Sequence, residues 1–95
     1  MEAIIKTHNY ETFTKNFIEN WKNKKSYKFA MGKVGFWYYT IELSGKDLLC
    51  YKVNSNKLGT TNLLAKHDTK NFNEDDFETT LYEVHLECLC DMIFD

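Results

Sequence analysis

The chain contains no proline and no arginine, so all twelve of its basic residues are lysine. Arginine is the usual bidentate reader of phosphate and guanine, and the chain therefore lacks the side chain that most often recognises nucleic acid. Only four glycines are available for a phosphate-binding loop, and the patterns G-x-S-x-G, H-E-x-x-H and C-x-x-C do not occur. These absences favour a protein that is not an enzyme, and we expect no cofactor.

The three cysteines, Cys50, Cys88 and Cys90, are too few and odd in number for the disulfide framework of a small secreted domain. The first residues, MEAIIKTHNYE, lack the basic start, apolar run and small-residue cleavage site of a signal peptide. No apolar run approaches the ~20 residues that a membrane-spanning helix needs. We therefore expect a soluble, cytoplasmic protein without a membrane partner.

Length and composition predict one folded domain over residues 1–95. A chain of 95 residues with 43% hydrophobic and 16% aromatic side chains has enough apolar material for a single core. The net charge of -2 is small, which is typical of a folded chain rather than a disordered one.

Hydrophobic periodicity predicts a helix at each end of the chain. Over residues 9–25, Phe13, Phe17 and Trp21 recur every four residues, and Asn9 can cap the helix start. The final helix follows Asn73 and opens with three acidic residues, which suit the positive end of the helix dipole. Its expected apolar side consists of Phe77, Leu81, Val84 and Cys88, broadened by Leu86, Leu89, Met92 and Ile93.

The middle of the chain predicts antiparallel strands. We expect them at 26–31, 36–43, 48–53 and 60–65, with a break at 32–35, a hairpin turn at 44–47 and a polar connection at 67–73. The fold class is therefore α+β: an N-terminal helix, a three- or four-stranded antiparallel meander and a C-terminal acidic helix.

The strand at 36–43 is apolar on both faces. Trp37, Tyr39 and Ile41 form one set, and Phe36 and Tyr38 form the other. If both helices cover one face of the sheet, the second face exposes large aromatic side chains as a plausible interface. If one helix covers each face, both sets are buried. Strand register decides which set faces outward, and the sequence leaves this open.

Two short patterns resemble fragments of metal sites. His85-x-x-Cys88-x-Cys90 places Cys90 away from the other two on a helix, and a structural zinc site needs four convergent ligands. We interpret these cysteines as inert core thiols. His67-Asp68 resembles the paired ligands of HD-type phosphohydrolases but lacks their further ligands, and we interpret it as part of a polar connector. We expect no metal.

The basic stretch consists of Lys22, Lys24, Lys25 and Lys28, interleaved with Trp21 and Tyr27. Lysines with aromatic residues can bind single-stranded nucleic acid through phosphate contacts and base stacking. The structural interpretation is that the lysines complement a helix end while the aromatic residues belong to the core.

Charge is distributed very unevenly along the chain. Residues 1–35 carry +4, residues 36–65 carry +1 and residues 66–95 carry -7. On the final helix Asp76, Glu83, Glu87 and Asp91 fall within one sector, with Asp95 continuing it. A four-residue step on a helix rises ~6 Å, comparable to the spacing of phosphates along a strand. Such a row could enter a basic groove in place of nucleic acid, whereas the structural interpretation is a solvated helix face.

A short chain with a lysine-rich first helix, a strand meander and the closing segment NEDDFETTLYEVHLECLCDMIFD resembles the small inhibitors carried by phages and mobile elements. Anti-CRISPR proteins and DNA-mimic inhibitors are the nearest group, and the likeness lies in size, charge layout and lack of catalytic motifs. The resemblance implies tight binding that blocks a host defence protein or a nucleic-acid enzyme.

The leading hypothesis is a non-enzymatic inhibitor of a host nucleic-acid-binding or defence protein. Asp76, Glu83, Glu87 and Asp91 would present negative charge, and Tyr38 or Tyr39 would supply a desolvated anchor. Two alternatives remain open: a nucleic-acid-binding module that uses Lys22, Lys24, Lys25 and Lys28, and a homodimeric regulatory protein that pairs through its sheet face.

Overall fold

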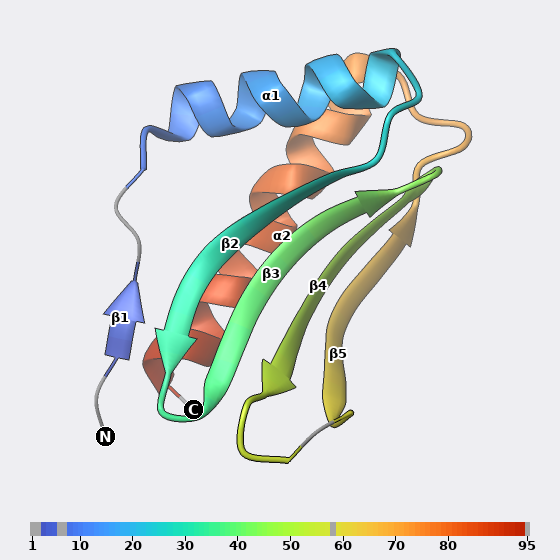
Figure 1. The fold of residues 1–95 in the computed structure, drawn as a ribbon. Helices are drawn as coiled ribbons and strands as arrows, with labels where there is room; N and C mark the ends of the chain where they lie inside the picture. The colour runs from blue at the N-terminus through green and yellow to red at the C-terminus, as the bar shows by residue number, and fades with distance from the viewer. Residues whose placement is uncertain (1–2, 6–7, 58, 95) are drawn as a thin grey trace.

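The structure, a computed structural model, describes residues 3–5, 8–57 and 59–94 of the chain. Its elements follow the order β1 (Ala3–Ile5), α1 (Tyr10–Lys22), β2 (Tyr27–Val34), β3 (Trp37–Ser44), β4 (Asp47–Asn54), β5 (Thr61–Asp68) and α2 (Glu74–Phe94) (Figure 1). The predicted α+β fold is confirmed, with α1 before the four-stranded meander and α2 after it.

The strands form one antiparallel sheet in the order β1-β2-β3-β4-β5, so each strand pairs with its neighbour in sequence. The short β1 was not expected, and it adds to the edge of β2. The expected break at 32–35 is present only at its end, where Gly35 and Phe36 form the turn between β2 and β3; before it β2 continues to Val34, with a register shift between Ala30 and Gly32. Gly32 has a φ of 147°, which only glycine adopts readily, so the strand bends there without ending.

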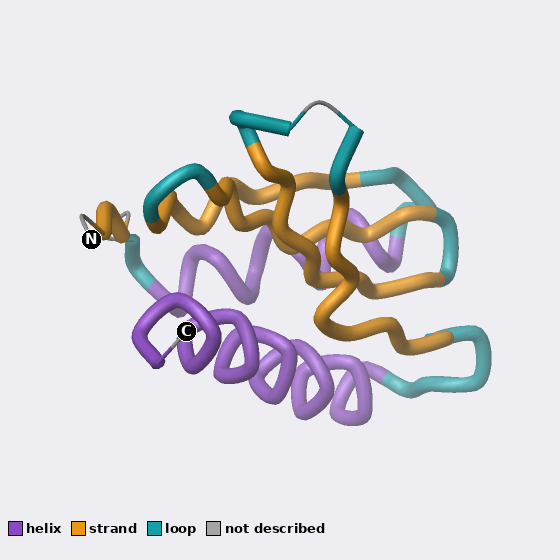
Figure 2. The backbone as a smooth tube through the Cα atoms, turned by 90° about the horizontal axis from the view of Figure 1, so that it is seen from below, coloured by secondary structure: helices purple, strands orange, loops and turns teal. Residues whose placement is uncertain are grey.

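Both helices cover the same face of the sheet. Phe13 of α1 packs edge-on against Phe29 of β2, and Phe29 pairs in register with Ile41 of β3. Asp91 of α2 accepts a hydrogen bond from Tyr39, which lies two residues from Ile41 and so on the same face. Figure 2 shows α2 running along one side of the sheet. The arrangement with one helix on each face therefore does not occur.

Side chains on β3 and β4 alternate between this covered face and the open one. Those that point toward the helices and are buried are Tyr39, Ile41, Leu43, Leu48, Cys50 and Lys52. Register places Tyr38, Thr40, Glu42, Leu49, Tyr51 and Val53 on the open face. The core between sheet and helices is completed by Phe13, Phe17, Met31, Val34, Ala65, Phe77, Leu81, Val84, Cys88 and Met92.

The strand β5 continues to Asp68, so the prediction that residues 67–73 form a loop is wrong at its first two positions. His67 pairs in register with Leu48, and Asp68 pairs with Asp47. The pairing of β5 with β4 continues beyond Ala65 although Lys66, His67 and Asp68 are polar, because the backbone of β4 pairs with these residues.

Both helices have well-formed ends. At the end of α1, Lys24 N–H donates to the Trp21 carbonyl and Lys25 N–H to the Asn20 carbonyl, which is a Schellman motif. At the start of α2, the Asn73 side chain accepts a hydrogen bond from the Asp76 amide at 2.8 Å. Within the described residues, neither helix has the length and apolar character needed to cross a bilayer.

Candidate functional site

The helix α2 has a strongly acidic surface. Its 21 residues include seven carboxylates and no lysine, even in the last turn. Glu74 forms an ion pair with Lys22 of α1, and Asp91 forms one with Lys52. The remaining acidic side chains are exposed and make no ion pair among the described residues; they are Asp75, Asp76, Glu78, Glu83 and Glu87. This helix therefore presents uncompensated negative charge to solvent.

Asp76 has a structural task in addition to its exposure. Its carboxylate accepts a hydrogen bond from the Asn73 amide at 3.2 Å, while the Asn73 side chain bonds the Asp76 amide. This reciprocal arrangement is a capping box, which stabilises the first turn of a helix. Of the predicted acidic row, Glu83 and Glu87 are the exposed members with no hydrogen bond or ion pair among the described residues.

Asp91 does not belong to the exposed acidic row, which corrects the prediction from its position in the helix. Its Oδ2 accepts a hydrogen bond from Tyr39 at 2.5 Å and lies 2.9 Å from Lys52 Nζ. The row drifts around α2 toward the sheet, because a four-residue step advances the side chain by about 400° rather than one full turn. By its fourth member, the side chain faces β3 and β4.

Within the cluster of Tyr39, Lys52 and Asp91, the contacts fix the protonation state of Tyr39 and Asp91. Burial raises the pKa of the Tyr39 phenol, and the Asp91 carboxylate raises it further, so the phenol remains a donor. Burial alone would raise the pKa of Asp91 as well, but the hydrogen bonds from Tyr39 and Lys52 outweigh it and lower that pKa. Lys52 Nζ also lies 4.9 Å from the Trp37 ring centroid.

The two predicted tyrosine anchors lie in different environments. Tyr39 is only 1% exposed, so the structure gives it no surface from which to contact a partner. Tyr38 is 48% exposed on the open face of the sheet, with Lys33 Nζ 5.3 Å from its ring centroid. The sheet separates Tyr38 from α2, and one flat contact cannot use both Tyr38 and the acidic helix.

Several apolar side chains of α2 are exposed that the sequence had assigned to the core side or left unassigned. Tyr82, Leu86, Ile93 and Phe94 are all more than 40% exposed. Tyr82, Leu86 and Ile93 share one stripe with the half-buried Leu89, at steps of four, three and four residues. The sequence contained a sign of this exposure: the apolar positions of this helix cover more of its circumference than one core-facing stripe requires.

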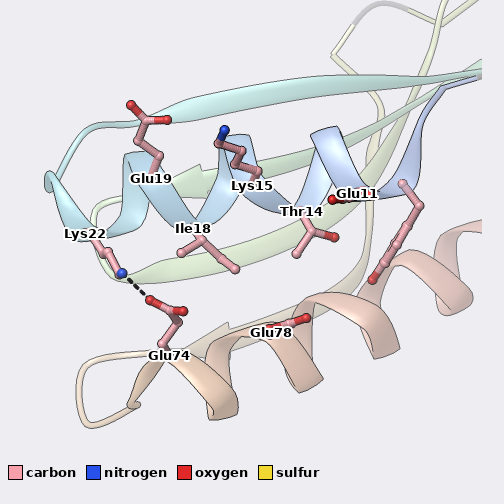
Figure 3. A pocket seen from close by; sticks show the side chains of 9 residues that line it. Glu11, Thr14, Lys15, Ile18, Glu19, Lys22, Glu74 and Glu78 are labelled. Atoms are coloured by element: carbon pink, nitrogen blue, oxygen red, sulfur yellow. Dashed lines mark ion pairs between the residues drawn. The ribbon is translucent and has the colours of Figure 1, made fainter.

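A groove of about 560 Å³ runs between α1 and α2, on the side away from the strands (Figure 3). From α1 it is lined by Tyr10, Glu11, Thr14, Lys15, Ile18, Glu19 and Lys22, and from α2 by Glu74 and Glu78. The Lys22–Glu74 ion pair closes one end. At the other end Tyr10 meets Tyr82 edge-on, with ring centroids 6.1 Å apart, so the groove leads onto the apolar stripe of α2.

The four lysines of the alternative nucleic-acid site do not converge. Lys22 faces α2 through its pair with Glu74, and Lys28 points to the open face of the sheet, 4.0 Å from Glu42. Lys24 and Lys25 are exposed in the turn after α1. The structure therefore spreads these charges over separate sides of the molecule.

Among the cysteines and histidines, Cys50, Cys88 and His85 are buried in the core. Contact with the Cys50 thiol and burial both raise the pKa of Cys88, which keeps it protonated and unreactive. Cys90 is exposed. His85 Nε2 lies 3.2 Å from His8 Nε2. Across the described ranges, no group of three or more histidine, cysteine or carboxylate side chains is arranged to hold a metal ion.

Comparison with known proteins adds no relative: no protein-family model, curated protein or solved structure matches this chain.

Proposed function

We propose that this chain is a non-enzymatic, protein-binding inhibitor whose contact surface is the outer side of α2. The partner is a basic surface on a cytoplasmic host defence or nucleic-acid-binding protein, in keeping with the resemblance to inhibitors carried by phages and mobile elements. The observation that carries the proposal is that one helix without lysine combines exposed Tyr82, Leu86 and Ile93 with two carboxylates, Glu83 and Glu87, that make no ion pair within the described part of the chain.

The two kinds of side chain have different tasks in such a contact. Uncompensated carboxylates attract a basic partner over several ångströms and raise the association rate, an effect that salt screens. Apolar and aromatic side chains supply the desolvated centre that holds the complex together. The anchors therefore come from α2 itself rather than from Tyr38 or Tyr39.

The experiment starts with capture of the partner from host lysate, with and without nuclease, by the tagged protein. Binding kinetics with the captured partner are then measured for Glu83→Lys with Glu87→Lys. This variant changes the net charge of the chain from -2 to +2, and both changes lie at the contact. We therefore expect the association rate to fall about tenfold or more at low salt and to lose most of its salt dependence.

A matched control separates the position of the charge from its amount. Glu83→Lys alone adds two to the net charge, and so does Thr61→Lys combined with Leu63→Lys on the open face of the sheet. Only Glu83→Lys should slow association. Equal slowing by both variants, or partners that disappear after nuclease treatment, would overturn the assignment to α2.

A further inference from the structure

The floor of the groove between α1 and α2 contains two buried hydroxyl groups, those of Tyr10 and Thr14, which lie near each other but form no well-aligned hydrogen bond. Thr14 is 8% exposed, and its Oγ1 is buried, as is the Tyr10 phenolic oxygen. Neither atom makes a hydrogen bond of good geometry with another described residue. Nearly all buried hydroxyls in folded proteins are paired, because an unpaired one costs free energy, so two neighbouring exceptions in one groove call for an explanation.

The surroundings of these hydroxyls favour a cationic ligand. Glu78 lies on the α2 wall next to Tyr10. Burial raises the pKa of the Tyr10 phenol, a contact with the Thr14 hydroxyl lowers it, and the charge of Glu78 raises it. Glu74 is matched by Lys22, which leaves Glu11, Glu19 and Glu78 against Lys15 along the rest of the rim. The rim of the groove therefore carries more carboxylates than ammonium groups.

We propose that this groove receives the alkylammonium group of a lysine side chain from the partner protein, an inference that rests on the proposed function. The aliphatic stem packs on Ile18 and the Tyr10 ring, and the ammonium donates to the Glu78 carboxylate. The hydroxyls of Tyr10 and Thr14 are the acceptors for its other two protons.

The number and kind of acceptors select lysine over arginine. An ammonium has three donors that point in separate directions, which matches one carboxylate and two separate hydroxyls. A guanidinium is planar and is best satisfied by two coplanar oxygens, an arrangement that Tyr10 and Thr14 do not offer. Figure 3 shows Thr14 and Ile18 directed from α1 into the space above Glu78, as this assignment requires.

The test needs no partner protein. N-acetyl-lysine methylamide is titrated into the isotope-labelled full chain, and amide and methyl shifts are followed by NMR. We expect saturable shifts at Thr14 and Ile18, a loss of affinity of about tenfold in Glu78→Gln, and a similar loss in Thr14→Val. The same ligand with its ε-amine acetylated is the matched probe without charge, and it should produce no saturable shift.

Thr14→Val gives a second, independent readout. Valine has the shape of threonine without the hydroxyl, so the free protein should become more stable while it loses affinity for the lysine ligand. Thr12→Val on the exposed side of α1 is the control and should leave the affinity unchanged. Loss of stability in Thr14→Val with unchanged affinity would show that the hydroxyl is only structural and would overturn the proposal.

Further outcomes separate this inference from the proposed function. Butylammonium carries the same stem and ammonium as lysine and should bind with similar affinity; absence of its binding would show that the shifts come from the amide backbone of the ligand and would overturn the assignment to the side chain. Absence of saturable shifts while Glu83→Lys with Glu87→Lys still slows association of the captured partner would remove the groove and leave the α2 contact in place. Saturable shifts without any captured partner would support the groove as a lysine site and remove the α2 contact.

Discussion

Lys52 is a cation inside the core, 5% exposed on the helix-covered face of β4. Its ammonium lies 2.9 Å from the Asp91 carboxylate and 4.9 Å from the Trp37 ring centroid. A buried ion pair contributes little net stability compared with apolar side chains, but removal of one partner leaves a desolvated charge behind. The pair connects the last turn of α2 to β4.

Asp91→Leu should lower the free energy of unfolding by about 2 kcal/mol, because it removes a carboxylate that faces a buried ammonium. Chemical denaturation measures the change. Asp91→Leu combined with Lys52→Met should recover most of it, since neither charge then remains in the core. A double variant less stable than Asp91→Leu alone would contradict this account of the pair.

At the scale of elements, the end of α1 shows a residue in an unfavourable conformation. Lys24 has a φ of 56° and is, among the described residues, the non-glycine residue with positive φ. It occupies the position after the helix end that glycine usually fills in a Schellman motif. The helix therefore ends at Lys22, and the expected helical span of 9–25 is too long by one residue at its start and three at its end.

Lys24→Gly should raise the free energy of unfolding by about 1 kcal/mol, because glycine adopts positive φ without the steric cost of a Cβ atom. Thermal and urea denaturation check this. Lys25→Gly next to it is the matched control, since Lys25 does not have positive φ, and it should bring no gain. A gain of the same size in both variants would mean that the loss of a surface lysine, rather than the backbone, is responsible.

The elements were predicted well where one physical rule decides, and less well where tertiary contacts decide. The four-residue spacing of Phe13 and Phe17 and the Asn9 cap were sufficient to predict α1. In the structure both phenylalanines are buried and Asn9 caps the helix. The extension of β5 through His67 was missed, because β4 holds that segment in the sheet although its own side chains are polar.

The candidate site was predicted in part. A polar face on α2 follows from the sequence, but its angular drift placed Asp91 against the sheet and left Glu83 and Glu87 outside. Strand register decided that Tyr38 faces solvent and Tyr39 the core, and the sequence of one strand cannot fix register alone. The groove depends on the packing of α1 on α2, which brings residues more than fifty positions apart into contact.

At the scale of the whole molecule, His8 and His85 join the segment before α1 to the middle of α2. Their Nε2 atoms lie 3.2 Å apart, and both rings pack against Phe13. One imidazole must donate and the other accept in this contact, so protonation of both places two donors face to face. Burial, together with the nearby His8, lowers the pKa of His85.

A lowered pKa means that the folded state binds the proton less readily than the unfolded chain does. The free energy of unfolding should therefore be highest above the ordinary histidine pKa of ~6.5 and fall as the pH is lowered through the pKa of folded His85. Urea denaturation between pH 7.5 and 5 measures this slope. His85→Phe should flatten it, and His67→Gln should not; an unchanged slope in His85→Phe would place the acid sensitivity elsewhere.

Every strand of the sheet lies beside its neighbour in sequence, whereas α1 and α2 meet across almost the full length of the chain. Short loops close early and cheaply during folding, and contacts between distant segments form late. The four-strand meander can therefore assemble as successive hairpins before the helices come together over its inner face. The contacts that join the two helices, Trp21 on Phe77 and Tyr10 on His85, should therefore form after the strand pairs.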